Sequence, residues 1–184
     1  MTNTTAPQDQ PINTNLRRLA LLCLLSWLAM LGVDFFLHGG LLAAFWVQDS
    51  PFLLPPAQAF SLIPVGYAAF LLLAVLLIWL MTRLEITGWG PGFIFGLKLG
   101  ALVWGALVLG LNSATTAGLP LLLSWFVGQT LEMAVGGAVI GRALGGERLS
   151  RLFLIVLGLV VLFFVITIVM QSLGLAPTVR MNPA

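Results

Sequence analysis

The chain has 184 residues, of which 60% are hydrophobic and only 8% are charged, and its formal net charge is +2. Soluble domains carry about 25% charged residues, so the long apolar runs are expected to be solvated by lipid rather than folded into one globular core. The scattered basic residues argue against nucleic-acid binding, and the one cysteine, Cys23, excludes an intrachain disulfide.

The first predicted helix follows a polar segment. Residues 1–16 lack an apolar face and are expected to be a disordered cytoplasmic tail. A basic pair then precedes an apolar run over residues 19–37, which is too long for a secretory signal core and is interpreted as a retained helix. A Gly-Gly pair should loosen or end this helix. Residues 38–58 are therefore expected to form an interfacial helix or an extension of the first helix, followed by a proline-containing loop.

Four further apolar runs predict spans over residues 59–82, 91–111, 119–144 and 152–173. Runs of about 20 residues match the hydrocarbon thickness of a bilayer at 1.5 Å rise per residue. The last span is the most apolar, and its polar interruptions, which include Thr167 and Gln171, lie in its second half. We therefore predict an all-α integral membrane protein with five spans, in which four helices form a polar-cored bundle and the C-terminal helix is peripheral. Residues 17–174 are expected to form one domain, followed by a short tail over residues 175–184.

The Lys and Arg pattern predicts an orientation. Five spans place the N-terminal junction and the loops after spans two and four on one side, and these segments carry Arg17, Arg18, Arg83, Arg142, Arg148 and Arg151. The opposite loops, 38–58 and 112–118, carry no Lys or Arg, and Arg180 in the tail is the only basic residue expected on that side. Because the positive side is normally cytoplasmic, we expect a multi-pass protein of a bacterial-type cytoplasmic membrane, with its N-terminus inside and its C-terminus outside.

Glu132, near the middle of the fourth predicted span, is the first candidate functional residue. An ionisable side chain at that depth is costly unless it has a partner, so it is a functional candidate by default. Trp125, Gln129 and Glu132 recur at i, i+4 and i+7, which puts them on one side of a helix. This spacing predicts that Glu132 faces the bundle rather than lipid.

The partner of Glu132 is open at this level. Lys98 lies about 10 Å from the cytoplasmic end of the third span and Glu132 about 18 Å from that end of the fourth, so an ion pair is within the reach of the two side chains. Alternatively, Lys98 extends to the headgroups and a proton neutralises Glu132.

Asp34 and His38 share a face if the first helix continues that far. One possibility is that they form a proton-handling or ligand-binding pair at the outer end of the bundle. The other is that they form an interfacial pair that faces headgroup water, where a polar side chain costs less free energy than in the membrane centre. Asn112 shares a face with Lys98 and is a further candidate, although it borders the outer loop. Asp34 and Glu132 are expected to lie at different depths.

Small residues predict where helices pack closely. The third span carries Gly92, Gly96 and Gly100, and the fourth carries Gly137 and Gly141. Such GxxxG steps let helix backbones approach one another in lipid. Because the other side of the third span also carries small residues, that span is expected to be central.

The absence of several sequence motifs excludes some classes of functional site. One histidine excludes a bis-histidine haem and a multi-histidine zinc site within the chain, and no CxxC, HExxH, P-loop or GxSxG motif is present. We therefore predict no metal, no cofactor and no catalytic residue.

The leading hypothesis is a non-enzymatic structural or accessory subunit or a small-molecule binding module. The alternatives are a small proton-coupled transporter or channel that uses Glu132 and, as a weaker one, a membrane enzyme that uses Asp34, His38 and Glu132. The expected partners are the lipid bilayer, a second copy or another membrane protein, and an unidentified small molecule.

Residues 19–144 carry a layout with an Asp that closes the first span, a glycine-rich third span, a polar run, and a fourth span with a Trp and an acidic residue. In this chain these features are Asp34-Phe35-Phe36-Leu37, FGLKLGALVWG, Asn112-Ser113-Ala114-Thr115-Thr116, Ser124-Trp125-Phe126 and Glu132. In this layout the chain resembles a group of small bacterial four-helix membrane proteins with no assigned activity. The resemblance implies architecture only, and the fifth span departs from it.

Overall fold

The computed structural model describes residues 15–48 and 50–177 of the chain. Within these residues the structure is helical and contains no strand. The elements are α1 (Leu16–Phe36), the π-helix η1 (Leu37–Leu41), α2 (Ala43–Trp46), α3 (Pro56–Arg83), α4 (Trp89–Ala114), α5 (Leu119–Leu144) and α6 (Leu149–Ser172). Nearly all of the predicted N-terminal tail, the predicted position of Arg180 and most of the C-terminal tail lie outside the described residues.

Five of the described helices are long and apolar enough to cross a membrane, as the sequence predicts: α1 with η1, α3, α4, α5 and α6. The helix that contains Glu132 begins and ends where it is predicted, and the other helix ends lie within about four residues of the predicted span ends. The helix pattern is consistent with a multi-pass membrane protein.

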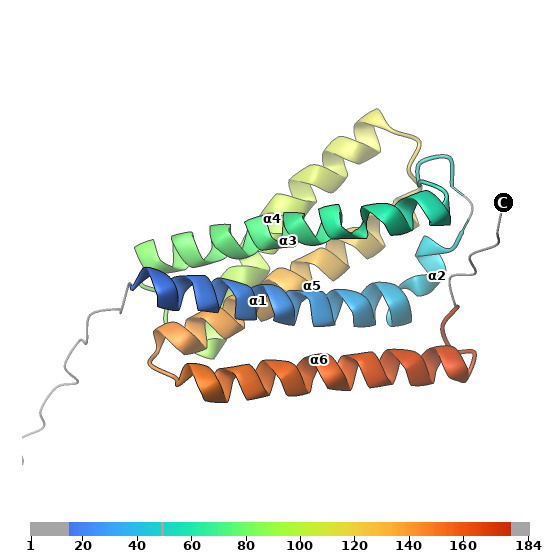
Figure 1. The fold of residues 1–184 in the computed structure, drawn as a ribbon. Helices are drawn as coiled ribbons and strands as arrows, with labels where there is room; N and C mark the ends of the chain where they lie inside the picture. The colour runs from blue at the N-terminus through green and yellow to red at the C-terminus, as the bar shows by residue number, and fades with distance from the viewer. Residues whose placement is uncertain (1–14, 49, 178–184) are drawn as a thin grey trace, which may run out of the picture.

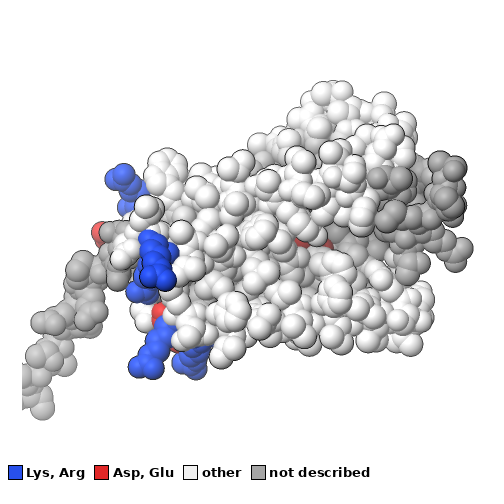
Figure 2. Space-filling model, viewed as in Figure 1, with Lys and Arg blue, Asp and Glu red and all other residues white. Residues whose placement is uncertain are grey.

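The arginines lie at one end of the bundle. α1 begins, α3 ends, α5 ends and α6 begins at the same end (Figure 1). The residues near those helix ends include Arg17, Arg18, Arg83, Arg142, Arg148 and Arg151. Figure 2 shows the visible Lys and Arg atoms gathered at that end, which is called the arginine end below. There Arg18 Nη2 donates to the carbonyl oxygen of Ala143 at 2.9 Å, which ties the start of α1 to the end of α5.

α1 is the central helix and packs against α3, α5 and α6. α6 runs along α1 (Figure 1), and Phe35 stacks on Phe164 and Phe36 on Phe163, with 4.8 Å between the ring centroids in each pair.

α4 lies at the edge of the helix assembly, so the prediction that the third span is central is wrong. α4 packs almost entirely against α5, and its far half extends away from the other helices in Figure 1. The reason lies on the face opposite its glycines, where small residues alternate with large apolar ones. Ile94, Leu102 and Leu109 are exposed there.

The contact between α4 and α5 is made by backbone. A Cβ atom at Gly92 would collide with the carbonyl oxygen of Gly137, and one at Gly96 would collide with that of Met133. The same contact contains Gly100 and Gly141. The five glycines that the sequence marks for helix packing therefore all lie at this one interface.

η1 continues α1 and contains the Gly39-Gly40 pair, so the helix changes its winding at this point rather than ending. The widened turn is held from outside by α6, because Gln171 Nε2 donates to the carbonyl oxygen of Gly39 at 2.8 Å. A Cβ atom at Gly39 would lie 3.3 Å from the methyl group of Thr167. Thr167 and Gln171, two polar residues of α6, thus both face η1.

The half of the bundle toward the arginine end is filled mainly by apolar side chains. Its fully buried members include Leu22, Met30, Leu77, Met81 and Ile140. The opposite half contains the polar residues described next.

Candidate functional site

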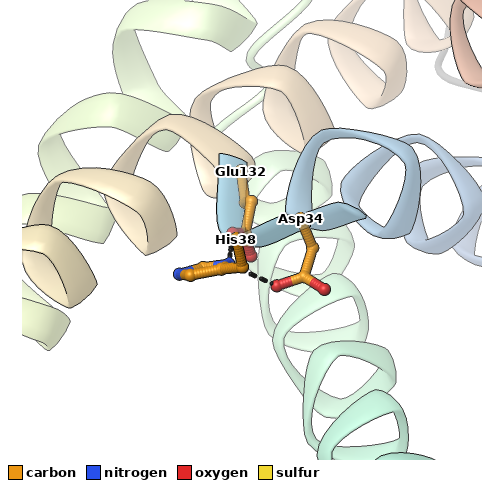
Figure 3. A group of neighbouring side chains, drawn as sticks. All are labelled: Asp34, His38 and Glu132. Carbon is orange, nitrogen blue, oxygen red and sulfur yellow. Dashed lines mark hydrogen bonds and ion pairs between the residues drawn. The ribbon is translucent and has the colours of Figure 1, made fainter. Parts of the chain in front are cut away.

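Three titratable side chains from three elements meet inside the bundle (Figure 3). Asp34 comes from the last turn of α1, His38 from η1 and Glu132 from the middle of α5. Nδ1 of His38 lies 2.7 Å from Oδ1 of Asp34 and 3.7 Å from Oε1 of Glu132. One ligand atom from each residue lies within 4.8 Å of the other two. We call Asp34, His38 and Glu132 the acid–imidazole triad.

The expectation that Asp34 and Glu132 lie at different depths is wrong. α1 and α5 run in opposite directions (Figure 1), and each Cα–Cβ bond tilts toward the N-terminus of its own helix. The side chain of Asp34 therefore leans toward the arginine end and that of Glu132 away from it, so the two carboxyl groups converge. Counting the rise along each helix places only the Cα atoms and does not include this convergence.

Glu132 is fully buried and is held by its neighbour on α5. Gln129 Nε2 donates to Glu132 Oε1 at 3.3 Å, as the spacing that placed them on one face implies. Within the described residues, His38 is the only basic side chain at ion-pair distance from Glu132 or from Asp34.

Lys98 does not meet Glu132. It is exposed, and the glycine face of α4, on the other side of that helix, is the one that packs on α5. Of the two alternatives left open by the sequence, the ion pair between Lys98 and Glu132 is therefore wrong. Asn112 is also exposed, near the end of α4, and takes no part in the triad.

A cavity of about 460 Å³ adjoins the triad. Its walls come from α1, η1, α2, α3, α4 and α5, and it lies in the half of the bundle away from the arginine end. Figure 2 shows acidic atoms in a recess about midway along the visible face. The cavity is lined by Asp34, His38, Trp46, Ile63, Gly66, Tyr67, Ala69, Phe70, Trp104, Trp125 and Gln129.

Aromatic rings make up much of the cavity wall. Trp125, a sequence-predicted candidate, has its ring centroid 5.5 Å from that of Trp46 and 6.1 Å from that of Trp104. The ring of His38 meets Trp46 edge-on at 4.9 Å. Tyr67 is placed by its backbone, because Trp27 Nε1 donates to the Tyr67 carbonyl oxygen at 2.8 Å. The wall therefore combines flat apolar surfaces with indole and phenol groups that can form hydrogen bonds.

Several buried polar atoms around the cavity have no hydrogen-bond partner among the described residues. They are Nε2 of His38, Nε1 of Trp46 and Trp104, Oε1 of Gln129 and Oε2 of Glu132. Most buried polar groups in proteins are partnered, and an exception calls for a reason such as a bound water, ion or ligand. Five exceptions in one region mark it as a candidate binding site.

Of the residues that line the cavity, the sequence indicated Asp34, His38, Trp125 and Gln129. It did not indicate the aromatic residues Trp46, Tyr67 and Trp104 of the wall, nor Gly128 beside His38. Gly128 matters because a Cβ atom there would lie 3.1 Å from Cε1 and from Nε2 of His38. Helical spacing offered one signal, since Gly128 lies four residues before Glu132 and so shares its side of α5.

Comparisons of the chain with protein-family models, curated proteins and solved structures found no match. The resemblance to small four-helix membrane proteins therefore stays a prediction, and the function has to be argued from the site.

Proposed function

We propose that the chain is a multi-pass protein of the cytoplasmic membrane of a bacterial-type cell, with its N-terminus inside and its C-terminus outside. The five long apolar helices support insertion. The gathering of arginines at one end supports the orientation, because that end is cytoplasmic under the positive-inside rule. The triad and its cavity then lie in the outer half of the membrane.

Within the membrane the protein acts as a small-molecule binding module. The observation that carries this proposal is the cavity of about 460 Å³, whose wall joins aromatic rings to polar groups that lack partners. Ligand pockets are largely apolar and contain a few placed polar groups. A packed bundle without a ligand would be expected to bury apolar residues at these positions instead.

The shape of the cavity indicates the chemistry of the ligand. Its apolar wall on α3 includes Ile63 and Gly66, both of which are exposed, so the cavity is open at this wall. A Cβ atom at Gly66 would meet nothing within 4 Å. A ligand therefore enters sideways from the bilayer beside α3, and it has an apolar body. Its polar end accepts from the indole N–H groups and donates to Gln129.

A membrane enzyme is the second candidate, because the three side chains of the triad lie together beside the cavity and the objection based on depth no longer holds. Proton-coupled transport through Glu132 comes third. Transport needs access from both sides, and the space between the triad and the arginine end is filled by packed residues such as Met30, Leu77 and Ile140.

The binding proposal is tested by closing the cavity mouth. The wild-type chain, Gly66→Leu and Gly158→Leu are purified in parallel, and their co-purifying small molecules are extracted and compared by mass spectrometry. Gly158 on α6 is the matched control, because a Cβ atom there also meets nothing within 4 Å but it does not line the cavity. We expect a lipophilic species that is retained by wild type and Gly158→Leu and is depleted at least tenfold in Gly66→Leu. Identical extracts from all three proteins would contradict the proposal.

A further inference from the structure

We propose that the acid–imidazole triad is a binding site for a divalent transition metal ion of the zinc class. The site forms part of the wall of the proposed ligand cavity. It does not depend on the proposed organic ligand, because the ion can be tested alone.

The donor set fits such an ion. One imidazole nitrogen and two carboxylate oxygens are ligands that zinc accepts, and three protein ligands with an open position are typical of zinc sites that also bind a second molecule. The ligand atoms are already gathered, with Nδ1 of His38 at 2.7 Å from Asp34 and at 3.7 Å from Glu132. Ligands around a tetrahedral zinc lie about 3.4 Å apart, so side-chain shifts on the order of 1 Å complete the site.

Unpartnered buried atoms provide a second observation that points to a ligand here. Glu132 is fully buried, and no residue of the described ranges forms a hydrogen bond to its Oε2. Gln129 is 3% exposed, donates to the other oxygen of Glu132, and leaves its own Oε1 without a partner. Gln129 thereby orients the Glu132 carboxylate as an outer-shell residue orients a metal ligand.

The charge of the cluster favours a cation. Two carboxyl groups share one imidazole, and no Lys or Arg of the described residues lies at ion-pair distance from either of them. A buried charge that lacks compensation is costly. A divalent ion bound by two carboxylates and a neutral imidazole brings the cluster to zero net charge, and a bound ion is often the largest local charge in such a site. Protons on the carboxyl groups are the competing means of neutralisation, and the experiment below separates the two.

The cavity gives an ion access to the triad and leaves one coordination position of the ion free. Asp34 and His38 line the cavity, and their side chains are 17% and 16% exposed, whereas Glu132 lies behind them. A metal held by the three would therefore present its free coordination position to the cavity, where the polar end of a ligand would lie.

The test uses the full chain without a histidine tag, purified in detergent, stripped with a chelator, and titrated with Co²⁺ alone as a spectroscopic substitute for Zn²⁺. We expect about one ion per chain, a visible absorption band, and displacement of that band by Zn²⁺. Asp34→Asn and Glu132→Gln should each weaken binding by more than about 100-fold, since outer-shell changes alone cost 10–100-fold. Glu147→Gln is the matched control, because this carboxylate at the arginine end pairs with Arg142 at 2.7 Å and should leave binding unchanged.

A second measurement keeps the test independent of variant folding. Cu²⁺ bound to the wild-type chain is examined by pulsed electron paramagnetic resonance for coupling to an imidazole nitrogen. Because the chain contains one histidine, such coupling assigns the ion to His38. Fewer than about 0.1 ion per chain, Co²⁺ binding that survives both triad variants, or bound Cu²⁺ without imidazole coupling would each overturn the metal site and leave protons as the neutralising species. The ligand proposal would stand or fall separately on the extracts from Gly66→Leu.

Discussion

The ring of His38 lies against the backbone of Gly128 on α5, at a position where a Cβ atom would be 3.1 Å from both Cε1 and Nε2. This separation is tighter than ordinary van der Waals contact, so even a methyl group requires the ring to move. His38 also contacts the carboxyl group of Asp34 and the ring of Trp46, which lies nearly perpendicular to it. The absence of a side chain at position 128 therefore helps to set where the imidazole of the triad lies.

Gly128→Ala is the first test of that relationship. The added methyl group should displace the ring by a few tenths of an ångström and reduce Co²⁺ affinity about tenfold, the lower range for outer-shell changes. Gly158→Ala is the control, because it makes the same substitution in a helix with open space around the new Cβ atom. Equal Co²⁺ affinity in the two variants would show that Gly128 does not position His38.

The α4–α5 interface makes a prediction about stability. Gly96→Ala places a Cβ atom against the carbonyl oxygen of Met133, which is backbone and cannot rotate away. Overpacking of this kind costs about 1–3 kcal/mol, which outweighs the gain of up to about 1 kcal/mol in helix propensity. The free energy of unfolding in mixed micelles, followed by circular dichroism, should fall accordingly.

Gly110→Ala provides the matched control on the same helix, because a Cβ atom at position 110 meets nothing within 4 Å. This variant should be as stable as the wild type or slightly more stable. If Gly96→Ala proves no less stable than Gly110→Ala, the two helices do not pack through their backbones at this point.

The sequence was sufficient to predict the helices, because apolar runs and turn residues are local signals. It was also sufficient to identify Glu132 and Gln129, since their spacing fixes a shared helix face whatever surrounds it. The glycine motifs indicated close packing, although they did not reveal that all five glycines belong to one interface.

Local sequence signals did not predict that Asp34, His38 and Glu132 come together. Whether Glu132 meets Lys98 or His38 depends on which face of α5 packs on α4 and which on α1, and helix spacing alone does not specify the neighbour. The continuation of α1 through Gly39 and Gly40 as a π-helix was a further obstacle. Such a turn is stabilised from outside, here by Gln171 of α6, and π-turns of this kind are frequent at functional sites.

A double-mutant cycle tests the choice of partner for Glu132. Combining Lys98→Met with Glu132→Gln should give additive changes in unfolding free energy, with a coupling below about 0.5 kcal/mol, because the two side chains are not in contact. Combining His38→Gln with Glu132→Gln should give a coupling of about 0.5–3 kcal/mol, as expected for residues in one polar network. A larger coupling for the lysine pair than for the histidine pair would reverse the assignment.

The proposed orientation is tested with reporters that are active on only one side of the membrane. A fusion after Ala184 should report the non-cytoplasmic side, since five spans separate it from a cytoplasmic N-terminus. A fusion after Gly146, which removes α6, should report the cytoplasmic side, because four spans remain and the arginines near the end of α5 lie inside under the positive-inside rule. The paired fusions control for expression and for reporter folding, since each should be active with the reporter that is silent for the other. The same side for both fusions would mean that α6 does not cross the membrane. Exchanged sides would keep the five spans but place the arginine end outside, and the triad would then lie in the inner half of the bilayer.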